Sequence, residues 1–359
     1  MHMKSLKKVI IALLIIILVP PLAYFLFMCY LTLVEYRPDA TETIEPVHNE
    51  KTMDSTDDSY TIASWNIGYG ALGDNADFFM DGGKSVNTAS KERVEQNIKG
   101  MQEVLNEISP DFVFLQEVDR NSDRSHRINE AYEIASSMDG FSSAFAINFK
   151  VPFIPYPFPP IGKVDGGLFT LSAYDIENAE RVSLPCPFGW PLRLGNLKRC
   201  LLVSRIPIEE SEKELVLVNL HLEAYDSGEG KAQQTALLKT FLEQECEKGN
   251  YVVAGGDFNQ TFSSIDTSKF PVHEDNWQAG TIDADSFDEY FNIFMDGDTA
   301  SGRSLLAPYE GADKSSFQFY IIDGFLVSKN IDTLSVETLD YDFKVSDHNP
   351  VVLKFKLGK

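Results

Sequence analysis

The residues of this chain that could do chemistry are acids, amides and histidines that close apolar, strand-like runs. Asp257 and Asn259 follow the apolar run 251–254 and the glycine pair 255–256. Small and β-branched residues predict a strand buried on both faces, and glycines permit sharp turning and close approach to the backbone. A carboxylate and a carboxamide at a rigid strand end suit an oxygen-liganded metal ion and a phosphate oxygen. An ordinary strand-ending turn is the alternative interpretation.

The same pattern recurs along the chain, where polar residues lie at or beside the ends of other apolar runs. These further residues are Asn66, Glu117, His221, Asp323, Asp347 and His348. Taken singly, each of these residues could have a purely structural role. Asparagine is common in turns, and a lone histidine in an apolar strand is usually a core residue whose hydrogen bonds are satisfied. Their shared placement makes independent coincidence a poor explanation. We therefore expect them to converge on one site.

Alternating strands and helices would position these residues. Apolar runs predict strands at 60–66, 112–117, 166–173, 201–204, 215–222, 251–254, 319–327 and 351–355. Helical periodicity predicts helices at 91–108 and 229–247. A helix between two strands is a βαβ pattern, which indicates an α/β fold. The acidic, poorly periodic region 270–308 is predicted to be rich in loops.

The N-terminus carries an uncharged apolar run at 9–34, preceded by Lys4, Lys7 and Lys8. At about 1.5 Å per residue, a helix of this length crosses a hydrocarbon core of about 30 Å. A cleaved signal peptide is the alternative, but its apolar region is normally shorter and ends in a small-residue cleavage site. Lysines before the span and acids after it predict a cytoplasmic segment 1–8, a single-pass signal anchor at 9–34 in the cell membrane, and an extracytoplasmic remainder.

Two segments of unusual composition follow the predicted anchor. Residues 35–59 are rich in acids, Thr, Ser and Pro without periodicity, which predicts a solvated acidic linker ahead of a catalytic domain at 60–359. Residues 151–161 combine prolines with Phe153, Tyr156 and Phe158, which excludes a helix or a central strand. This segment is either a loop packed over the core or an exposed apolar lip that contacts a membrane or lipid chain.

The composition is that of a globular protein with a strongly acidic charge. The 359 residues are 43% hydrophobic and 24% charged, which is enough apolar material for a sizeable core. A net charge of −23 repels polyanions and disfavours tight non-specific binding of nucleic acid. The cysteines show neither metal-type spacing nor a disulfide framework: Cys29, Cys186, Cys200 and Cys246.

Taken together and in order, the strand-end motifs resemble those of the endonuclease/exonuclease/phosphatase superfamily, the relatives of pancreatic deoxyribonuclease, AP endonucleases, neutral sphingomyelinases and inositol polyphosphate 5-phosphatases. The motifs are Ser-Trp-Asn-Ile at 64–67, Leu-Gln-Glu-Val at 115–118, Asn-Leu-His-Leu at 219–222, Gly-Gly-Asp-Phe-Asn at 255–259, Ile-Asp at 322–323 and Ser-Asp-His-Asn-Pro at 346–350. The resemblance implies a four-layer α/β sandwich of two mixed β-sheets flanked by helices. Here one transmembrane helix would precede it.

The resemblance also implies a metal site and a water-activating site. Glu117 would be the principal ligand of Mg²⁺, or alternatively of Mn²⁺, with Asn66 beside it. Asp257 and Asn259 would orient the attacking water and the phosphate. The chemistry agrees, because Mg²⁺ prefers one or two carboxylates together with water and substrate phosphate, and it neutralises charge that develops in the transition state.

Two histidines complete the implied site. His348 would be the general base, supported by Asp347, because an imidazole can take a proton from water while an adjacent carboxylate holds its orientation. His221 would hydrogen-bond a phosphate oxygen, and Asp323 would fix the orientation of His221. The motifs indicate which residues form the site more firmly than they indicate which residue transfers which proton.

These observations predict a membrane-anchored, Mg²⁺-dependent phosphoester hydrolase, either a phosphodiesterase or a phosphatase, that acts on a phospholipid or a small phosphorylated molecule. An extracellular metal-dependent endonuclease is the alternative, favoured if Arg193, Lys198 and Arg199 line the groove. A catalytically inactive surface binding module is a second alternative. The chain has Ala173 and Tyr174 where many members of the superfamily carry a basic residue, and it lacks the dense Lys/Arg loops of duplex-cutting enzymes.

Overall fold

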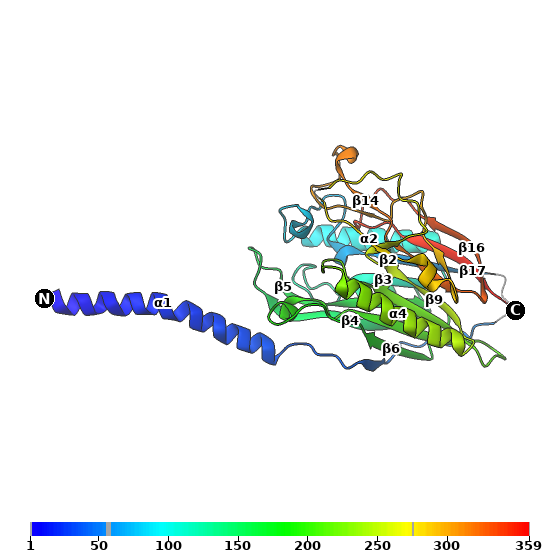
Figure 1. The fold of residues 1–359 in the computed structure, drawn as a ribbon, viewed down its shortest axis with the longest axis horizontal. Coiled ribbons are helices and arrows are strands. Elements are labelled where there is room, and N and C mark those ends of the chain that lie inside the picture. Colours follow the sequence, from blue (N-terminus) through cyan, green and yellow to red (C-terminus); the bar gives the residue numbers. More distant parts are fainter. Residues whose placement is uncertain (1, 55–58, 275, 359) are drawn as a thin grey trace.

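Two large mixed sheets pack face to face in the computed structural model, and helices cover their outer faces (Figure 1). The structure describes residues 2–54, 59–274 and 276–358; the predicted linker and domain also include residues 55–58, 275 and 359, which lie outside this description. The arrangement confirms the predicted α/β class with two mixed sheets and one N-terminal apolar helix.

The first sheet has seven strands in the order β1-β6-β7-β8-β9-β15-β12. Only β8 and β9 run parallel among these neighbours, and α4 joins them. The bounds are β1 (Thr41–Ile44), β6 (Asn178–Ser183), β7 (Cys200–Pro207), β8 (Glu214–His221), α4 (Glu229–Glu247), β9 (Tyr251–Asp257), β12 (Phe291–Phe294) and β15 (Asp323–Ser328).

The second sheet has six strands in the order β16-β17-β2-β3-β5-β4. Here β2 and β3 are the parallel pair, and α2 joins them, so the predicted βαβ unit is confirmed. The bounds are β2 (Tyr60–Asn66), α2 (Lys91–Ile108), β3 (Phe112–Asp119), α3 (Glu130–Ala135), β4 (Ser142–Ile154), β5 (Gly162–Ser172), β16 (Ile331–Thr338) and β17 (Val351–Leu357).

Short elements fill the loops at one end of the sandwich. In its described residues, 270–274 and 276–308, the predicted loop-rich region contains only brief strands and one 3₁₀ turn. The short strands are β10 (Gln260–Phe262), β11 (Gly280–Ile282), β13 (Gly302–Arg303) and β14 (Phe319–Tyr320), and the 3₁₀ turns are η1 (Gly68–Gly70), η2 (Phe79–Asp81), η3 (Leu192–Gly195), η4 (Ala284–Phe287) and η5 (Lys314–Ser316). The strand predicted over 319–327 is therefore divided into β14 and β15.

The central strands are apolar throughout because both of their faces are buried. Every residue of β9 is buried. Val253 of this strand packs between the sheets in one cluster with Phe114 of the opposite sheet. Its neighbour Val252 faces the other way and packs with Leu238 and Leu242 of α4. Alternation along the strand thus builds two core layers at once, and α2 covers the second sheet in the same manner.

The N-terminal helix α1 (His2–Leu33) extends away from the domain (Figure 1). Its segment Leu6–Leu33 has a mean hydropathy of 2.9, and the most apolar part of this segment is not buried against the rest of the protein. The helix is therefore long and apolar enough to cross a membrane. A signal sequence near an N-terminus has the same properties.

The segment between α1 and β2 is not the solvated linker expected from its composition. Strand β1 pairs antiparallel with β6 at the edge of the seven-stranded sheet. Val47 forms a bridge with Ser143, and Met53 forms a bridge with Ile208 and is completely buried. The described part of this segment, 35–54, therefore docks on the domain. The prediction of a solvated linker was wrong because a short edge strand and a single buried methionine leave no periodic apolar pattern in the sequence.

The proline-rich segment 151–161 forms the end of β4 and the turn into β5. Strand β4 is at the edge of its sheet, which agrees with the exclusion of a central strand. Val151 is buried, whereas Tyr156 is 74% exposed and Phe158 is 94% exposed. The tip therefore projects from the core rather than packing over it, and this matches the exposed-lip alternative in shape.

Candidate active site

Three neighbouring strands of the seven-stranded sheet place polar residues side by side at one edge. His221 is the last residue of β8 and Asp257 is the last residue of β9, and the two are register partners. Asp323 pairs with Asp257 from the antiparallel strand β15. Asp323 was expected near a strand end, but it begins β15, and the antiparallel direction brings it to the same edge. All three residues are at most 4% exposed.

The facing sheet contributes Asn66 and Glu117 at the corresponding edge. Asn66 ends β2, and Glu117 lies near the end of the parallel neighbour β3. The register between β3 and β5 shifts between Leu115 and Val118, and Glu117 has a φ of 54°. Such a bulge re-aims a side chain, and left-handed backbone is uncommon in residues other than glycine. Glu117 consequently lines the cavity between the sheet ends.

A buried amide pair joins the two sheets beneath these residues. Gln116 donates from Nε2 to Oδ1 of Asn219 at 2.8 Å. Asn219 donates in turn to the backbone carbonyls of Leu115 and Phe169, each at 3.1 Å. Losing one of these bonds would leave a buried polar group unsatisfied, which costs about 1–3 kcal/mol. The pair therefore fixes how the strand ends of one sheet lie against those of the other.

The turn before β17 brings Asp347 and His348 to the same place. Trp65 donates from its indole nitrogen to the backbone carbonyl of His348 at 2.8 Å. The Ser346 hydroxyl donates to the carbonyl of Asn66 at 2.7 Å and accepts from the backbone N–H of His348 at 3.2 Å. Asp347 and His348 are each 8% exposed. The turn is thus bonded directly to the end of β2.

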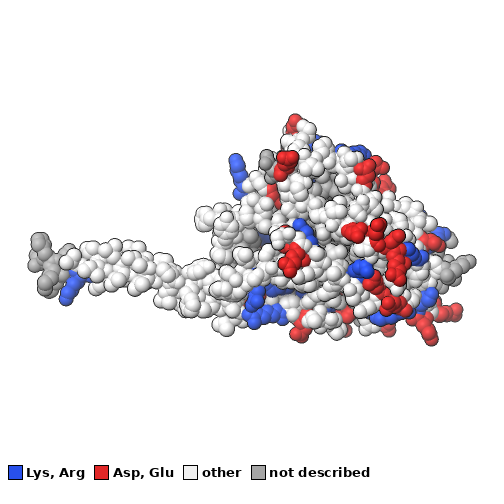
Figure 2. All heavy atoms as spheres, viewed as in Figure 1, with Lys and Arg blue, Asp and Glu red and all other residues white. Residues whose placement is uncertain are grey.

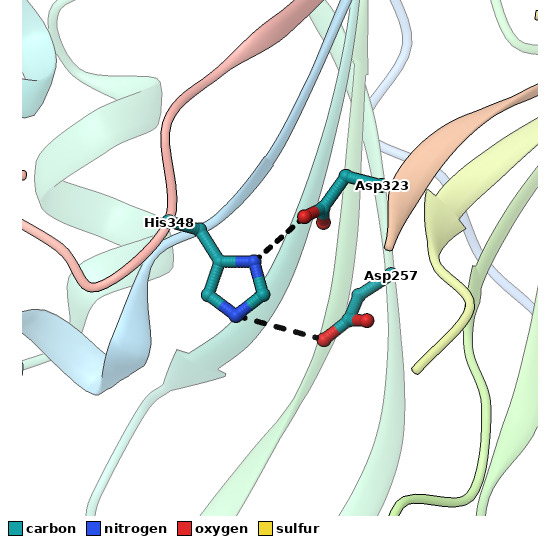
Figure 3. A group of neighbouring side chains, drawn as sticks. All are labelled: Asp257, Asp323 and His348. Carbon is teal, nitrogen blue, oxygen red and sulfur yellow. Dashed lines mark hydrogen bonds and ion pairs between the residues drawn. The ribbon is translucent and has the colours of Figure 1, made fainter. Parts of the chain in front are cut away.

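The imidazole of His348 lies between two carboxylates (Figure 3). Its Nδ1 is hydrogen-bonded to Oδ2 of Asp323 at 2.8 Å. Its Nε2 lies 3.9 Å from Oδ2 of Asp257. Asp323 holds the ring, and the other ring nitrogen therefore faces Asp257.

Two orientation roles implied by the resemblance differ from the observed contacts. Asp323 was expected to orient His221, and this is wrong, because its carboxylate is bonded to His348. The Nε2 atom of His221 instead lies 3.4 Å from Oδ2 of Asp257. Asp347 was expected to support His348, but among the described contacts Asp323 occupies that position. Adjacent sequence position was a poor guide to which acid faces which ring.

The two histidines are driven toward opposite protonation states. Burial lowers the pKa of His221 well below its usual range, and the charge of Arg199 lowers it further. Burial also opposes charge on His348, but the charge and hydrogen bond of Asp323 outweigh it and raise that pKa well above its usual range. Burial raises the pKa of Asp257 to about 7, and the charge of Asp323 acts in the same direction. A carboxyl group that titrates near neutrality thus lies between a neutral and a cationic imidazole.

Asn66 donates to the acids of both sheets. Its Nδ2 lies 3.0 Å from Oδ2 of Asp257 and 3.3 Å from Oε1 of Glu117. Its Oδ1 accepts from the backbone N–H of Gly68 at 3.0 Å. The amide nitrogen, rather than the oxygen, therefore faces the carboxylates. In this orientation Asn66 positions both acids, and its role as a metal ligand stays a prediction.

Asn259 reaches the site from a turn and not from the strand. Strand geometry ends at Asp257, and Asn259 has a left-handed φ of 51°. Oδ1 of Asp257 accepts from the backbone N–H of Asn259 at 2.8 Å, and the Asn259 amide donates to the carbonyl of Leu222 at 2.9 Å. Both residues nevertheless line the same cavity.

Three carboxylates of the set, those of Glu117, Asp257 and Asp347, line a cavity of about 210 Å³. Burial raises the pKa of Asp347 to about 6, and the charge of Glu117 acts in the same direction. A concentration of acidic oxygens at low dielectric fits a hard divalent cation such as Mg²⁺ or Mn²⁺. A second group, Asp257, Asp323 and His348, has its ligand atoms within 4.8 Å of one another. The Asp323 carboxylate of that group is bonded to His348 and lies outside the cavity lining, so the set with Glu117 fits the cation better.

Part of the cavity wall comes from residues that the sequence did not mark as site residues. Asp81, Tyr225, Trp277 and Tyr320 all line the cavity. The Tyr225 hydroxyl donates to Oδ1 of Asp81 at 3.2 Å, and the rings of Trp277 and Tyr320 meet edge to face with centroids 5.1 Å apart. Burial raises the pKa of Asp81 to about 7. Asp81, Tyr225 and Trp277 lie in loops or a 3₁₀ turn, and Tyr320 lies in a predicted strand but outside any motif, so only the fold brings them together.

Basic residues of the wall differ from those singled out in the sequence. The cavity is lined by the arginines Arg124, Arg199 and Arg303. Arg193 and Lys198 instead lie 3.2 Å and 3.4 Å from Oε1 of Glu35, outside the cavity lining. The condition that would favour a nuclease is therefore met by Arg199 alone.

A sequence model of the endonuclease/exonuclease/phosphatase family matches residues 63–348, which is most of the chain. The chain belongs to this family. Members of the family are metal-dependent phosphoesterases or nucleases, so the chain is a metal-dependent phosphoric ester hydrolase. The matched residues contain every position of the candidate site described above.

Solved structures show the same fold. The chain is similar to an endonuclease/exonuclease/phosphatase from Beutenbergia cavernae DSM 12333, with 16% identity and a TM-score of 0.55, over 84% of this chain and 72% of that one. It is also similar to the human Nocturnin catalytic domain with bound sulfate, with 17% identity and a TM-score of 0.50, over 88% of this chain and 97% of that one. At these identities the likeness shows the fold alone. No curated protein sequence matches the chain at a significant level.

Proposed function

We propose that this chain is a membrane-anchored, Mg²⁺-dependent phosphoester hydrolase that acts on a phospholipid or a small phosphorylated molecule. The observation that carries the proposal is the row His221, Asp257 and Asp323 across three strands, faced by Glu117 from the other sheet. Strand ends hold these groups without requiring a ligand to order them, and pre-positioned charge is the largest contribution to many enzymatic reactions.

Glu117 and Asp347 are the residues that would hold the divalent cation. When bound, the cation polarises a phosphoryl oxygen and neutralises charge that develops in the transition state. Asn66 would keep the carboxylate of Glu117 in place through its 3.3 Å contact. The donor set of oxygens supports Mg²⁺, with Mn²⁺ as the alternative.

The protein's own groups would carry the proton transfers. Asp257 would accept a proton from the attacking water, because Oδ2 of Asp257 is the atom toward which Asn66, His221 and His348 converge. His348, held at Nδ1 by Asp323, would present Nε2 to a phosphoryl oxygen. This assignment replaces the general-base role first expected for His348. His221 would contact the substrate phosphate from the other side, and Asn259 would keep the Asp257 carboxylate in position.

Several features support a lipid or a small substrate over a long nucleic acid. The net charge of −23 slows the approach of a polyanion, and an apolar helix precedes the domain. Arg193 and Lys198 are engaged by Glu35 instead of forming a basic track into the cavity. An endonuclease remains the second candidate, since Arg124, Arg199 and Arg303 would suit phosphates. An inactive binding module is disfavoured by family membership and by the complete polar set.

A substrate screen tests the proposed chemistry. The full chain in detergent or vesicles would be assayed on phospholipids, inositol phosphates, DNA and a soluble phosphodiester, with Mg²⁺ and with excess EDTA. We expect hydrolysis that EDTA abolishes and that Glu117→Ala or His348→Ala reduces by about 10²-fold or more. Full activity in EDTA would refute the metal assignment. Efficient DNA cleavage without lipid turnover would favour the nuclease.

Thiol labelling tests the proposed orientation of the anchored chain. Cys186 is exposed on the domain. A membrane-impermeant maleimide added to intact cells should therefore label the chain, and Cys186→Ser should remove that label. Labelling that requires permeabilised cells would place the domain in the cytoplasm. A processed N-terminus beyond residue 34 would show a cleaved signal in place of an anchor.

A further inference from the structure

The last turns of α1 contact the catalytic domain at two loops. The ring of Phe27 meets the ring of Phe153 edge-on, with centroids 6.3 Å apart. The indole of Trp190 donates to the hydroxyl of Thr32 at 3.2 Å. The first contact lies at the end of β4 and the second in the loop before β7. These contacts place both loops beside the apolar helix.

The two loops expose apolar and aromatic side chains next to α1. We call these residues the apolar rim; they are Phe153, Tyr156, Phe158, Trp190 and Leu192. Trp190 is 57% exposed and Leu192 is 67% exposed. Monomeric soluble proteins rarely cluster large apolar groups on their surface, and Trp and Tyr favour the headgroup region of a bilayer. In Figure 1, the β4–β5 end of the domain lies on the side from which α1 extends.

The distribution of charge around the apolar rim favours contact with a membrane. Figure 2 shows basic side chains gathered where α1 meets the domain, while most acidic side chains on this face lie toward the opposite end. At the junction, the carboxylate of Glu35 is engaged by Arg193 and Lys198, so its charge is compensated. On this face, most acidic side chains thus lie away from the junction of α1 with the domain, where they would oppose approach to an anionic membrane.

The loops that carry the apolar rim also line the candidate active site. Ile154 and Ile161 flank the β4–β5 tip, and Gly195 and Leu197 follow Leu192 in the other loop; all four line the catalytic cavity. These four residues therefore belong both to the loops of the rim and to the lining of the cavity that holds the carboxylates. A phospholipid lifted slightly from a bilayer at the rim would keep its acyl chains against apolar side chains while its phosphate reached the cavity floor.

We propose that the apolar rim is a second membrane contact, which seats on the same bilayer that α1 crosses and holds the cavity mouth at headgroup level. The occupant is the lipid surface itself, because the rim is continuous with a helix of membrane-spanning length. The inference rests on the anchoring in the proposed function and does not depend on the reaction catalysed. To the proposed anchoring it adds a fixed orientation of the domain, in which the mouth of the catalytic cavity faces the lipid.

A depth-sensitive probe tests the contact without requiring catalysis. Phe158→Cys, in the full chain carrying Cys29→Ser, Cys186→Ser and Cys246→Ser, would be labelled with an environment-sensitive fluorophore and reconstituted in phosphatidylcholine vesicles. The matched control is Leu334→Cys in the same background, since Leu334 is 49% exposed on β16 at the other end of the domain (Figure 1). We expect a blue-shifted emission at position 158 that lipid-borne spin labels quench, and neither effect at position 334.

The outcomes separate this inference from the proposed function. If the chain floats with the vesicles but the probes at both positions have equal emission and neither is quenched, the rim contact alone is refuted. Failure to float overturns the anchor and the rim together. Quenching at position 158 in a chain that hydrolyses nothing supports the rim while refuting the proposed chemistry.

A second measurement links the rim to catalysis. Replacing Phe153, Tyr156 and Phe158 together by serine should reduce hydrolysis of vesicle phospholipid and leave cleavage of a soluble phosphodiester unchanged. Leu334→Ser should change neither activity. Equal loss on both substrates would show a structural defect, and an unchanged rate on vesicles would overturn the contribution of the rim to substrate delivery.

Discussion

Replacing Asp323 by Asn removes the charge that keeps His348 protonated and retains the shape of the side chain. The bond between Nδ1 of His348 and Oδ2 of Asp323 is 2.8 Å long, and the two side chains are 10% and 1% exposed. A hydrogen bond with a charged partner contributes about 1.5–3 kcal/mol and a neutral one about 1 kcal/mol. The imidazolium therefore loses about 1–2 kcal/mol. At about 1.4 kcal/mol per unit, the pKa of His348 falls by about one unit.

The sign of the kinetic effect distinguishes the two roles of His348. Its pKa is raised, so the protonated form is present at neutral pH and is lost as the pH rises through that value. If protonated His348 contacts the phosphoryl oxygen, Asp323→Asn moves the alkaline limb of kcat to lower pH by about one unit. The rate at the optimum, where His348 is still protonated, should fall by about 10-fold, because the hydrogen bond that orients the ring is weakened by about 1–2 kcal/mol.

The assay measures kcat and KM for a soluble phosphodiester across the accessible pH range at saturating Mg²⁺. Asp175→Asn is the matched control, because Asp175 bonds Nδ1 of His48 at 3.0 Å on the surface, away from the cavity lining. A general-base role for His348 would instead extend the acid limb to lower pH. An unchanged rate and pH profile in Asp323→Asn would refute any catalytic role for the pair.

Two predictions concern stability. Burial would raise the pKa of Glu245, but hydrogen bonds from Arg205 and then Lys248 outweigh it and lower the pKa from 4.5 to about 2. The ionised carboxylate of Glu245 stabilises the folded state fully above its pKa in the unfolded chain, and this contribution is lost as the pH falls from about 4.5 to about 2. Glu245→Gln should therefore remove about 2–3 kcal/mol of the acid-induced decrease in the free energy of unfolding. Gly256→Ala places a Cβ 2.0 Å from the carbonyl oxygen of Leu220 at a φ of 144°, and urea denaturation should show a loss of about 3 kcal/mol or more. Gly189→Ala, where a Cβ meets nothing within 4 Å, should stay within about 0.5 kcal/mol of the parent.

The parts of the fold that follow from repeated local patterns could be predicted. The helices at 91–108 and 229–247 have the predicted bounds, because their positions are marked by apolar spacing and by stop signals such as Ser109-Pro110. The central strands were visible because burial on both faces makes them apolar throughout. Strand β1 was missed because its residues Thr41–Ile44 alternate between exposed and half-buried positions, which leaves no apolar signal.

Membership of the site was easier to predict than its pairing. Polar residues at strand ends can be recognised in a sequence, but which acid meets which imidazole depends on strand direction. Asp323 bonds His348 because β15 runs antiparallel to β9, and no local pattern at position 323 encodes that direction. Tyr225 and Asp81 meet across 144 sequence positions through loops, so their contact is a property of the assembled fold.

The docked segment after α1 has a consequence for how the enzyme would encounter substrate. Only residues 34–40 separate the end of α1 from β1, and seven extended residues reach at most about 25 Å. If α1 anchors the chain as proposed, a domain held this closely, with Glu35 paired with Arg193 and Lys198, would search the plane of the membrane and not a volume. Its turnover would follow lateral diffusion and the number of substrate molecules per unit area of its own leaflet. Diluting the vesicles at a constant protein-to-lipid ratio would then leave the rate per enzyme unchanged.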